Sequence, residues 1–299
     1  MPVSKKPRHK RKHKAALKPL ALPDRRILEQ LLAAFSAAAS DDPESQAQEI
    51  MFDAWEEADP IARIALVRKA LETSPSCADA YVALAQETAI STEEARDLFA
   101  KGVEAAERAL GPQVFEEYAG HFWGYHQTRP YMRARAGLAG ALLKLGETAG
   151  AIGHFRAMLK LNPDDNQGIR YTLLGCLVRQ DDPAAINELL DAYEDDGSAF
   201  WLYTRVLMAF RSGAGTEAQL AALVRDALDA NEYVPAILAG AMPEVTSEDG
   251  YLTMGGADEA TEYTTECGTV WHSTPGAVEW LANAASAASP RRKLASAAR

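Results

Sequence analysis

The sequence has 299 residues, of which 47% are hydrophobic, and it carries a net charge of −11. This length is enough to bury a sizeable core. No run of about 18 apolar residues occurs, so we expect no membrane-spanning helix and no membrane partner. The basic start is followed by no apolar signal-peptide core, which indicates a cytoplasmic protein.

The charge is unevenly distributed along the chain. Residues 1–14 contribute +7 and residues 291–299 contribute +4. Subtracting both from the net charge of −11 leaves −22 for the body between them. Residues 1–23 are polar and interrupted by prolines, and we expect them to form a disordered tail. This tail either contacts a nucleic acid or only keeps the protein in solution. Its candidate nucleic-acid contacts are Lys5, Lys6, Arg8, Lys10, Arg11, Lys12 and Lys14.

The three cysteines, Cys77, Cys176 and Cys267, are far apart and odd in number, which argues against a disulfide framework. We expect them to be small buried residues. His272 follows Cys267 by five positions, but two ligands fall short of the four that a closed zinc site needs. We therefore predict no metal site and no cofactor.

Helical periodicity begins after Asp24, a plausible N-cap, and the apolar residues of this first helix end at Phe35. A helical hairpin is predicted next, with its break at Asp59-Pro60 and its end at Ser74-Pro75. A second hairpin follows, and Gly111-Pro112 is predicted to stop it.

The clearest hairpin lies between Met132 and Pro163, where apolar and small residues follow the spacing of a tetratricopeptide repeat over about 34 residues. Ala139 and Ala151 would let its two helices approach, and Phe155 would fill the gap beside them. Two further hairpins are predicted before the pattern ends. Five hairpins exceed the roughly three that such repeats need, because each unit buries its apolar face against a neighbour.

Beyond the fifth hairpin the repeat is lost. We expect short helices around Asp258 to Tyr263 and from Pro275 to Ala285, with irregular chain between them. The predicted fold is all-α: a right-handed, tetratricopeptide-like helical-hairpin solenoid over residues 24–231, with an irregular C-terminal cap over residues 232–285. Residues 286–299 are expected to be a disordered tail.

Four sequence blocks carry a family resemblance: ADAYVALA, GHFWGYHQTRPYMRAR, LKLNPDDNQGIRYTLLGCL and STPGAVEWL. They are similar to the suppressor of tumorigenicity seven family and its bacterial relatives, over roughly residues 46–281. The resemblance implies an interaction protein and brings no catalytic residues with it. Eukaryotic members of that family are membrane proteins, and this sequence departs from them because it has no spanning segment.

The densest group of cations and aromatic side chains lies just before and within the third hairpin. The residue before Pro130 disfavours helical backbone, so Arg129 and Tyr131 are expected in the loop that enters the hairpin. Arginine beside aromatic faces suits the recognition of carboxylate or phosphate. The group consists of His121, Trp123, Tyr125, His126, Arg129, Tyr131, Arg133 and Arg135.

This group has two open interpretations. It could bind a protein, a peptide or a small phosphate-bearing ligand. Alternatively, Trp123 and Tyr131 are core residues, and the arginines pair with acids of the strongly acidic body.

A second candidate follows in the loop after Pro163. Asp165 or Asn166 is expected to cap the next helix, and the loop lacks the terminal glutamate of an EF-hand. Arg170 and Tyr171 lie in the first turn of that helix. They would either extend the arginine patch or serve only in capping and packing.

The sequence contains no GxSxG, HExxH, P-loop or GxGxxG element. We therefore predict a protein that is not an enzyme: an adaptor or scaffold that holds a protein or peptide partner in the concave groove of the solenoid. The alternative is a nucleic-acid- or ribosome-associated factor tethered by its basic N-terminal arm.

Overall fold

The structure is a computed structural model that describes residues 42–213, 215–247 and 252–297. Within these ranges the protein is all-helical, with thirteen α-helices, two short 3-10 helices and no strand. The first helix that the sequence predicts, at residues 24–35, and the basic tail lie outside the described residues.

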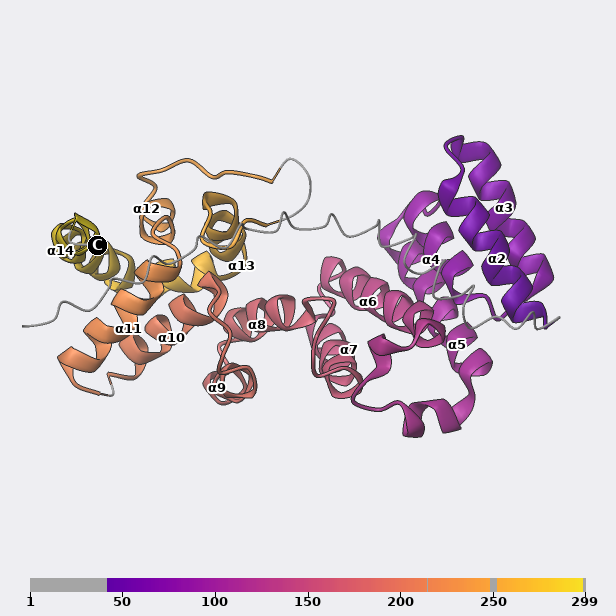
Figure 1. The fold of residues 1–299 in the computed structure, drawn as a ribbon, viewed down its shortest axis with the longest axis horizontal. Helices are drawn as coiled ribbons and strands as arrows, with labels where there is room; N and C mark the ends of the chain where they lie inside the picture. Colours follow the sequence, from indigo (N-terminus) through magenta and orange to yellow (C-terminus); the bar gives the residue numbers. More distant parts are fainter. Residues whose placement is uncertain (1–41, 214, 248–251, 298–299) are drawn as a thin grey trace, which may run out of the picture.

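The first ten helices form five consecutive pairs, and within each pair the two helices pack against each other. The pairs are α2 (Pro43–Glu56) with α3 (Pro60–Thr73), α4 (Ala78–Glu87) with α5 (Thr92–Glu117), α6 (Arg129–Lys144) with α7 (Thr148–Leu161), α8 (Ile169–Gln180) with α9 (Pro183–Ala192), and α10 (Ala199–Ser212) with α11 (Glu217–Ala230). The pairs follow one another along the long axis of the molecule, from α2 and α3 at one end to α10 and α11 near the other (Figure 1).

Three of these helices begin with the same Asp-Pro signal. Asp42, Asp59 and Asp182 each accept a hydrogen bond from a backbone N–H in the first turn, and a proline follows at the first helical position. Proline is tolerated there because its missing N–H would have had no partner inside the helix. The predicted break at Gly111-Pro112 is also present, because Gly111 has a positive φ of 69° inside α5 and interrupts its helical backbone.

The packing inside the third pair agrees with the sequence. Ala139 of α6 and Ala151 of α7 are fully buried, and Phe155 of α7 is also buried. The three cysteines are also free and buried, as predicted. Burial raises the pKa of Cys77 and of Cys267 to about 12, so neither thiol is ionised near neutral pH.

The C-terminal segment is more regular than the sequence predicts. It forms α12 (Val234–Leu238), α13 (Ala257–Ser273) and α14 (Ala277–Ala297). The expected short helix at residues 258–263 is part of the much longer α13, and α14 continues past Ala285 into the predicted disordered tail. Tertiary packing explains α13: its threonines and Gly268 are weak helix formers, but Tyr263, Cys267 and Trp271 form a fully buried stripe at helical spacing.

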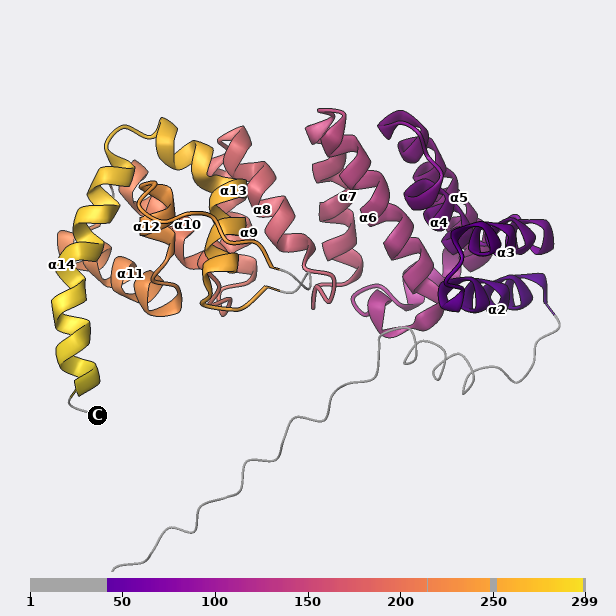
Figure 2. The ribbon, with the colours of Figure 1, turned by 90° about the horizontal axis from the view of Figure 1, so that it is seen from above.

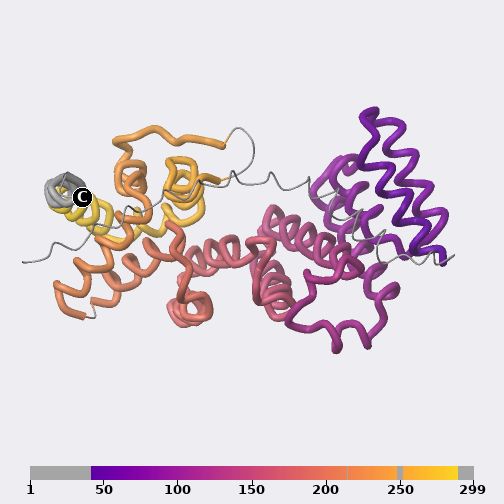
Figure 3. The backbone as a smooth tube through the Cα atoms, viewed as in Figure 1, coloured from indigo at the N-terminus to yellow at the C-terminus, as the bar shows by residue number. Residues whose placement is uncertain are grey.

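Helix α13 returns to the middle of the molecule. It packs against α8 and α10, and it lies on the opposite side of α8 from α9 (Figure 3). Arg179 of α8 donates hydrogen bonds to the backbone carbonyl and the carboxylate of Glu266 on α13, at 3.0 and 2.5 Å. The segment is therefore packed into the side of the fourth and fifth pairs. Figure 2 shows α14 at the far end.

The buried hydrophobic residues form two clusters. The smaller one joins α2, α3 and α4 around Met51, Val67 and Ala80. The larger one extends from α4 to α14. Helix α4 contributes residues to both clusters, which links the first pair to the rest of the molecule.

Helices α5 and α6 approach closely at Gly137. A Cβ atom on Gly137 would overlap the ring of Phe99, which is buried in α5. Gly140 lies about one turn further along α6, and nothing lies within 4 Å of the position its Cβ would take. Only the first of these glycines is required by packing.

We expect Gly137→Ala to lower the free energy of unfolding by about 2 kcal/mol, because it overpacks the contact with Phe99. Gly140→Ala on the same helix should instead raise it by about 0.5 kcal/mol, because alanine loses less backbone entropy on folding. Urea denaturation of both variants measures the difference. Effects of the same sign and size would contradict the close approach at Gly137.

Candidate functional site

The segment between α5 and α6 is folded onto the protein. It contains two single-turn 3-10 helices, Phe122–Gly124 and His126–Thr128. The N–H of Gly120 donates to the carbonyl of Leu161 at 2.9 Å, and the N–H of Trp123 donates to the side chain of Asn162 at 3.3 Å. These bonds fix the segment against the end of α7.

The two large aromatic residues of this region are in the core. Trp123 is 8% exposed and Tyr131 is 2% exposed. The ring of Tyr131 meets Phe115 and Phe122 at centroid distances of 4.9 and 5.7 Å. Burial, the largest cause, raises the pKa of the Tyr131 hydroxyl. Neither aromatic residue presents its ring to a ligand at the surface.

The sequence predicts Arg129 and Tyr131 in a loop, but both lie in the first turn of α6. Arg129 has helical backbone angles, φ −62° and ψ −38°, despite the general preference against them before a proline. Pro130 itself is tolerated because N–H groups in the first turn have no partner inside the helix. Arg129 donates to the carbonyl of Trp123 at 3.0 Å, and its guanidinium lies 5.4 Å from the centre of the Trp123 ring. Arg129 therefore connects the start of α6 to the preceding segment.

The exposed part of the group is small. His121 and Tyr125 are exposed, and His126 is half-buried. The ring of Tyr125 lies against that of Tyr118 with a centroid distance of 3.8 Å. These residues form a surface on the segment that precedes α6.

Arg133 is held by an ion pair between helices. Its Nε and Nη2 atoms donate to the two carboxylate oxygens of Asp79 on α4, at 2.8 and 2.6 Å. Asp79 is 1% exposed, and Gln48 of α2 also donates to it at 3.1 Å. The guanidinium of Arg133 lies 5.4 Å from the centre of the Trp55 ring. This fork-shaped pair joins three helices and satisfies a buried carboxylate.

Arg135 lies on the same helix but has different neighbours. Its Nη1 atom donates to the hydroxyl of Tyr131, and its guanidinium lies 5.5 Å from the centre of that ring. The positive charge of Arg135 acts on His154 of α7. Burial and then this positive charge lower the pKa of His154, which keeps the imidazole neutral at neutral pH.

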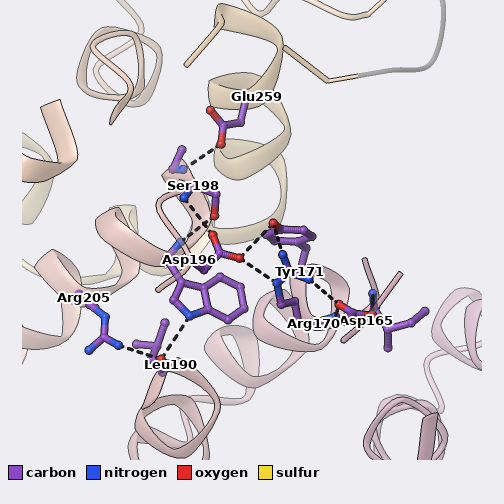
Figure 4. Close-up of polar contacts among 11 residues, drawn as sticks. Asp165, Arg170, Tyr171, Leu190, Asp196, Ser198, Arg205 and Glu259 are labelled. Carbon is purple, nitrogen blue, oxygen red and sulfur yellow. Dashed lines mark hydrogen bonds and ion pairs between the residues drawn. The ribbon is translucent and has the colours of Figure 1, made fainter. Parts of the chain in front are cut away.

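Arg170 is the centre of a third set of contacts, shown in Figure 4. Its guanidinium donates to Asp196 at 2.8 Å, to Asp165 at 3.0 Å and to the hydroxyl of Tyr171 at 2.7 Å. The hydroxyl of Tyr171 in turn donates to Asp196 at 3.0 Å. The guanidinium also lies near three aromatic rings, of which Tyr171 is the nearest at 4.4 Å. Arg170 is thus fully engaged within the protein.

The two carboxylates beside Arg170 also hold helix starts. Asp165 accepts the backbone N–H groups of Ile169 and Arg170 at the start of α8, as the sequence predicts for a capping side chain, although the N-cap position itself is Gly168. Asp196 accepts the N–H of Ser198 at 2.9 Å, just before α10. Burial opposes ionisation of Asp196, but hydrogen bonds from Ser198 and Arg170 outweigh it and lower the pKa of this carboxyl group. The network therefore connects two loops.

The arginines predicted to form one patch thus lie in separate sets of contacts. Arg133 binds a carboxylate of α4, Arg135 binds the hydroxyl of Tyr131, and Arg170 binds two carboxylates of neighbouring loops. Arg133 and Arg170 pair with acids, as the second interpretation has it, whereas the partner of Arg135 is a tyrosine hydroxyl. The sequence alone does not show that Arg133 pairs with an acid, because its partner Asp79 is 54 residues away.

The structure contains a groove that the sequence did not indicate. A cavity of about 410 Å³ lies between α7 and α9, with α8 at its floor. Its apolar part consists of Leu159, Leu173, Leu177 and Leu189, and Tyr193 lies at one end. Figure 1 shows α7 and α9 on either side of α8. A groove of this volume is in the range that binds ligands.

The rims of this groove carry charge. Arg156 and Lys160 lie on the α7 side, and Glu188 lies on the α9 side. All three side chains are exposed. None of them forms an ion pair with another of the residues that the structure describes, whereas Arg133 and Arg170 do. The groove combines an apolar floor with two cations that are not neutralised by those residues.

Fold and site together define an all-helical protein built from successive helix pairs, with an apolar groove between two of them. The sequence profile of the family described as ST7 protein matches residues 9–277, and the chain belongs to this family. None of the described helices is at once long enough and apolar enough to cross a lipid bilayer.

Individual relatives are similar over most of this chain. A protein ST7 homolog from Drosophila pseudoobscura pseudoobscura is 27% identical over 262 residues, which cover 80% of this chain and 48% of the relative. A suppressor of tumorigenicity 7 protein from Macaca fascicularis is 26% identical over 278 residues, covering 79% of this chain and 52% of the relative. The chain therefore spans about half the length of these relatives.

Proposed function

We propose that this protein is a non-catalytic adaptor that holds a protein or peptide partner on a right-handed, tetratricopeptide-like solenoid formed by α2–α11. Five successive helix pairs, with Ala139, Ala151 and Phe155 buried at the repeat positions of the third pair, support the solenoid. Such an array offers a long surface for binding a segment of another chain.

The groove between α7 and α9 carries this proposal. The arginines that the sequence suggested for the binding surface are engaged by internal carboxylates and a tyrosine hydroxyl, so a ligand would have to displace buried partners. The groove exposes apolar surface of Leu159, Pro163 and Ala192 and carries free charge at its rim. Both features are typical of a surface that buries a few anchoring side chains of a partner.

Filling the groove tests this function. Ala192 lines the groove at the end of α9 and is exposed, so Ala192→Trp should fill it without disturbing the core. Affinity purification of the full chain from its native host should recover a partner with the wild type and lose at least nine-tenths of it with Ala192→Trp. The expected loss follows from the exclusion of the anchoring side chains.

Ala184→Trp is the matched control, because Ala184 is exposed on the same helix and does not line the groove. The control variant should recover the partner as well as the wild type does, and both variants should melt within about 2 °C of the wild type. Recovery of the same proteins by all three chains would show that the groove is not the binding surface.

A further inference from the structure

The walls of the groove have the spacing of helix faces that pack on a helix. The lining residues of α7 are Arg156, Leu159 and Lys160, at positions i, i+3 and i+4, and Pro163 lines the groove just beyond the end of the helix. The lining residues of α9 are Ala185, Glu188, Leu189 and Ala192, at positions i, i+3, i+4 and i+7. Both stripes therefore follow their helix axes.

The side-chain sizes also suit a helix. Two of the four residues of the α9 wall, Ala185 and Ala192, are small and allow a close approach. Leu173 and Leu177 of the floor are one turn apart on α8 but are both only 2% exposed. The apolar surface that stays open to a partner therefore belongs mainly to Leu159, Pro163 and Ala192. An amphipathic helix binds such a groove by placing apolar residues at i, i+3 or i+4, and i+7 into it.

The rim charges decide which helix fits. Arg156 and Lys160 are one turn apart on the α7 rim, and neither has an ionic partner among the described residues. Carboxylates spaced by one turn along the edge of a bound helix would face both cations. A helix with lysines on that edge would instead place like charges together.

We propose that the groove binds an amphipathic α-helix of a partner protein, with an apolar stripe against Leu159, Pro163 and Ala192 and acidic residues along the α7 rim. This inference rests on the proposed adaptor function and names the partner that the groove accepts. It also opposes the overall charge of the protein, because a body of charge −22 would favour a basic peptide by general attraction.

Two labelled peptides of about 18 residues test the inference. Both carry the same leucine stripe at helical spacing, and one has glutamates beside the stripe where the other has lysines. Fluorescence anisotropy with the full chain at low salt should give the glutamate peptide about tenfold tighter binding, the effect of two rim ion pairs. The double variant Arg156→Glu, Lys160→Glu should reverse the preference. Equal or tighter binding of the lysine peptide to the wild type would overturn the proposal.

Further arms distinguish other occupants. A glutamate peptide with a central proline should bind at least tenfold more weakly, and equal binding would show an extended ligand and overturn the helix. The full-chain variant Leu28→Asp, Leu32→Asp should bind as the wild type does, and tighter binding would show that residues 27–35 of the chain itself occupy the groove. A dimer in sedimentation that Ala192→Trp dissociates would make a second copy the occupant, which also overturns the proposal.

The two proposals fail in different ways. If Ala192→Trp loses the host partner but the wild type shows no preference for the glutamate peptide, the helix inference is wrong and the adaptor function stands. If the partner is retained by Ala192→Trp, the groove has no part in the adaptor function.

Discussion

Replacing Arg170 with alanine is expected to lower the free energy of unfolding by about 3 kcal/mol. The substitution leaves the side chains of Asp165 and Asp196, which are only 2% and 6% exposed, without their cation. It also removes the guanidinium from the rings of Tyr171 and Trp201. Urea denaturation of the full chain measures the effect.

Arg156→Ala is the matched control for this prediction. Arg156 is exposed on α7 and has no ion pair among the described residues, so its replacement should change the free energy of unfolding by no more than about 0.5 kcal/mol. Arg170→Lys should fall between the two, because lysine keeps the charge but cannot bridge both carboxylates with a planar fork. If Arg170→Ala is as stable as Arg156→Ala, the network does not stabilise the fold and Arg170 is again a candidate for ligand binding.

The second large effect is expected at Glu259 on α13. This carboxylate is 2% exposed and accepts the N–H of Ala199 at 2.9 Å, the side-chain amide of Asn231 at 3.0 Å and the N–H of Gly255 at 2.7 Å. Glu259→Ala removes the buried carboxylate that accepts all three hydrogen bonds, so the three N–H donors lose this acceptor. We expect a loss of about 3 kcal/mol, measured by urea denaturation.

Glu262→Ala provides the comparison, because Glu262 is exposed on the same helix. It should unfold within about 0.5 kcal/mol of the wild type. Both variants and the wild type should unfold in a single transition. A separate early transition in Glu259→Ala, with no loss in the main one, would show that α13 detaches without affecting the helix pairs.

Local signals in the sequence predicted the helix pairs well. The Asp-Pro steps at Asp42, Asp59 and Asp182 mark helix starts, and glycines such as Gly146 and Gly213 end helices in left-handed conformation. These signals act within a few residues, so one sequence is enough to read them. The all-helical class and the order of the five pairs follow from them, whereas some bounds differ: α5 continues to Glu117, and α6 begins at Arg129 and not at Met132.

Local sequence signals do not predict contacts between residues that are far apart in the chain. For Arg133 and Arg170 the sequence left ligand binding and internal contacts both open, because nothing local shows that Asp79 and Asp196 approach them. The sequence predicts only a short helix at α13, because several of its residues are weak helix formers. The observed helix is longer because it packs on α8 and α10. The groove was missed for the same reason, since its lining comes from three helices whose spacing depends on tertiary packing.

The return of α13 to α8 has a consequence for how the chain is made. Arg179 and Glu266, which join these helices, are 87 residues apart in the sequence. In an array where each unit contacts only its neighbours, every pair can fold as soon as it leaves the ribosome. Here the fourth and fifth pairs remain incomplete until residue 273 has been synthesised. The middle of the molecule therefore acquires its final packing only after α13 has been synthesised, while the first three pairs can fold earlier.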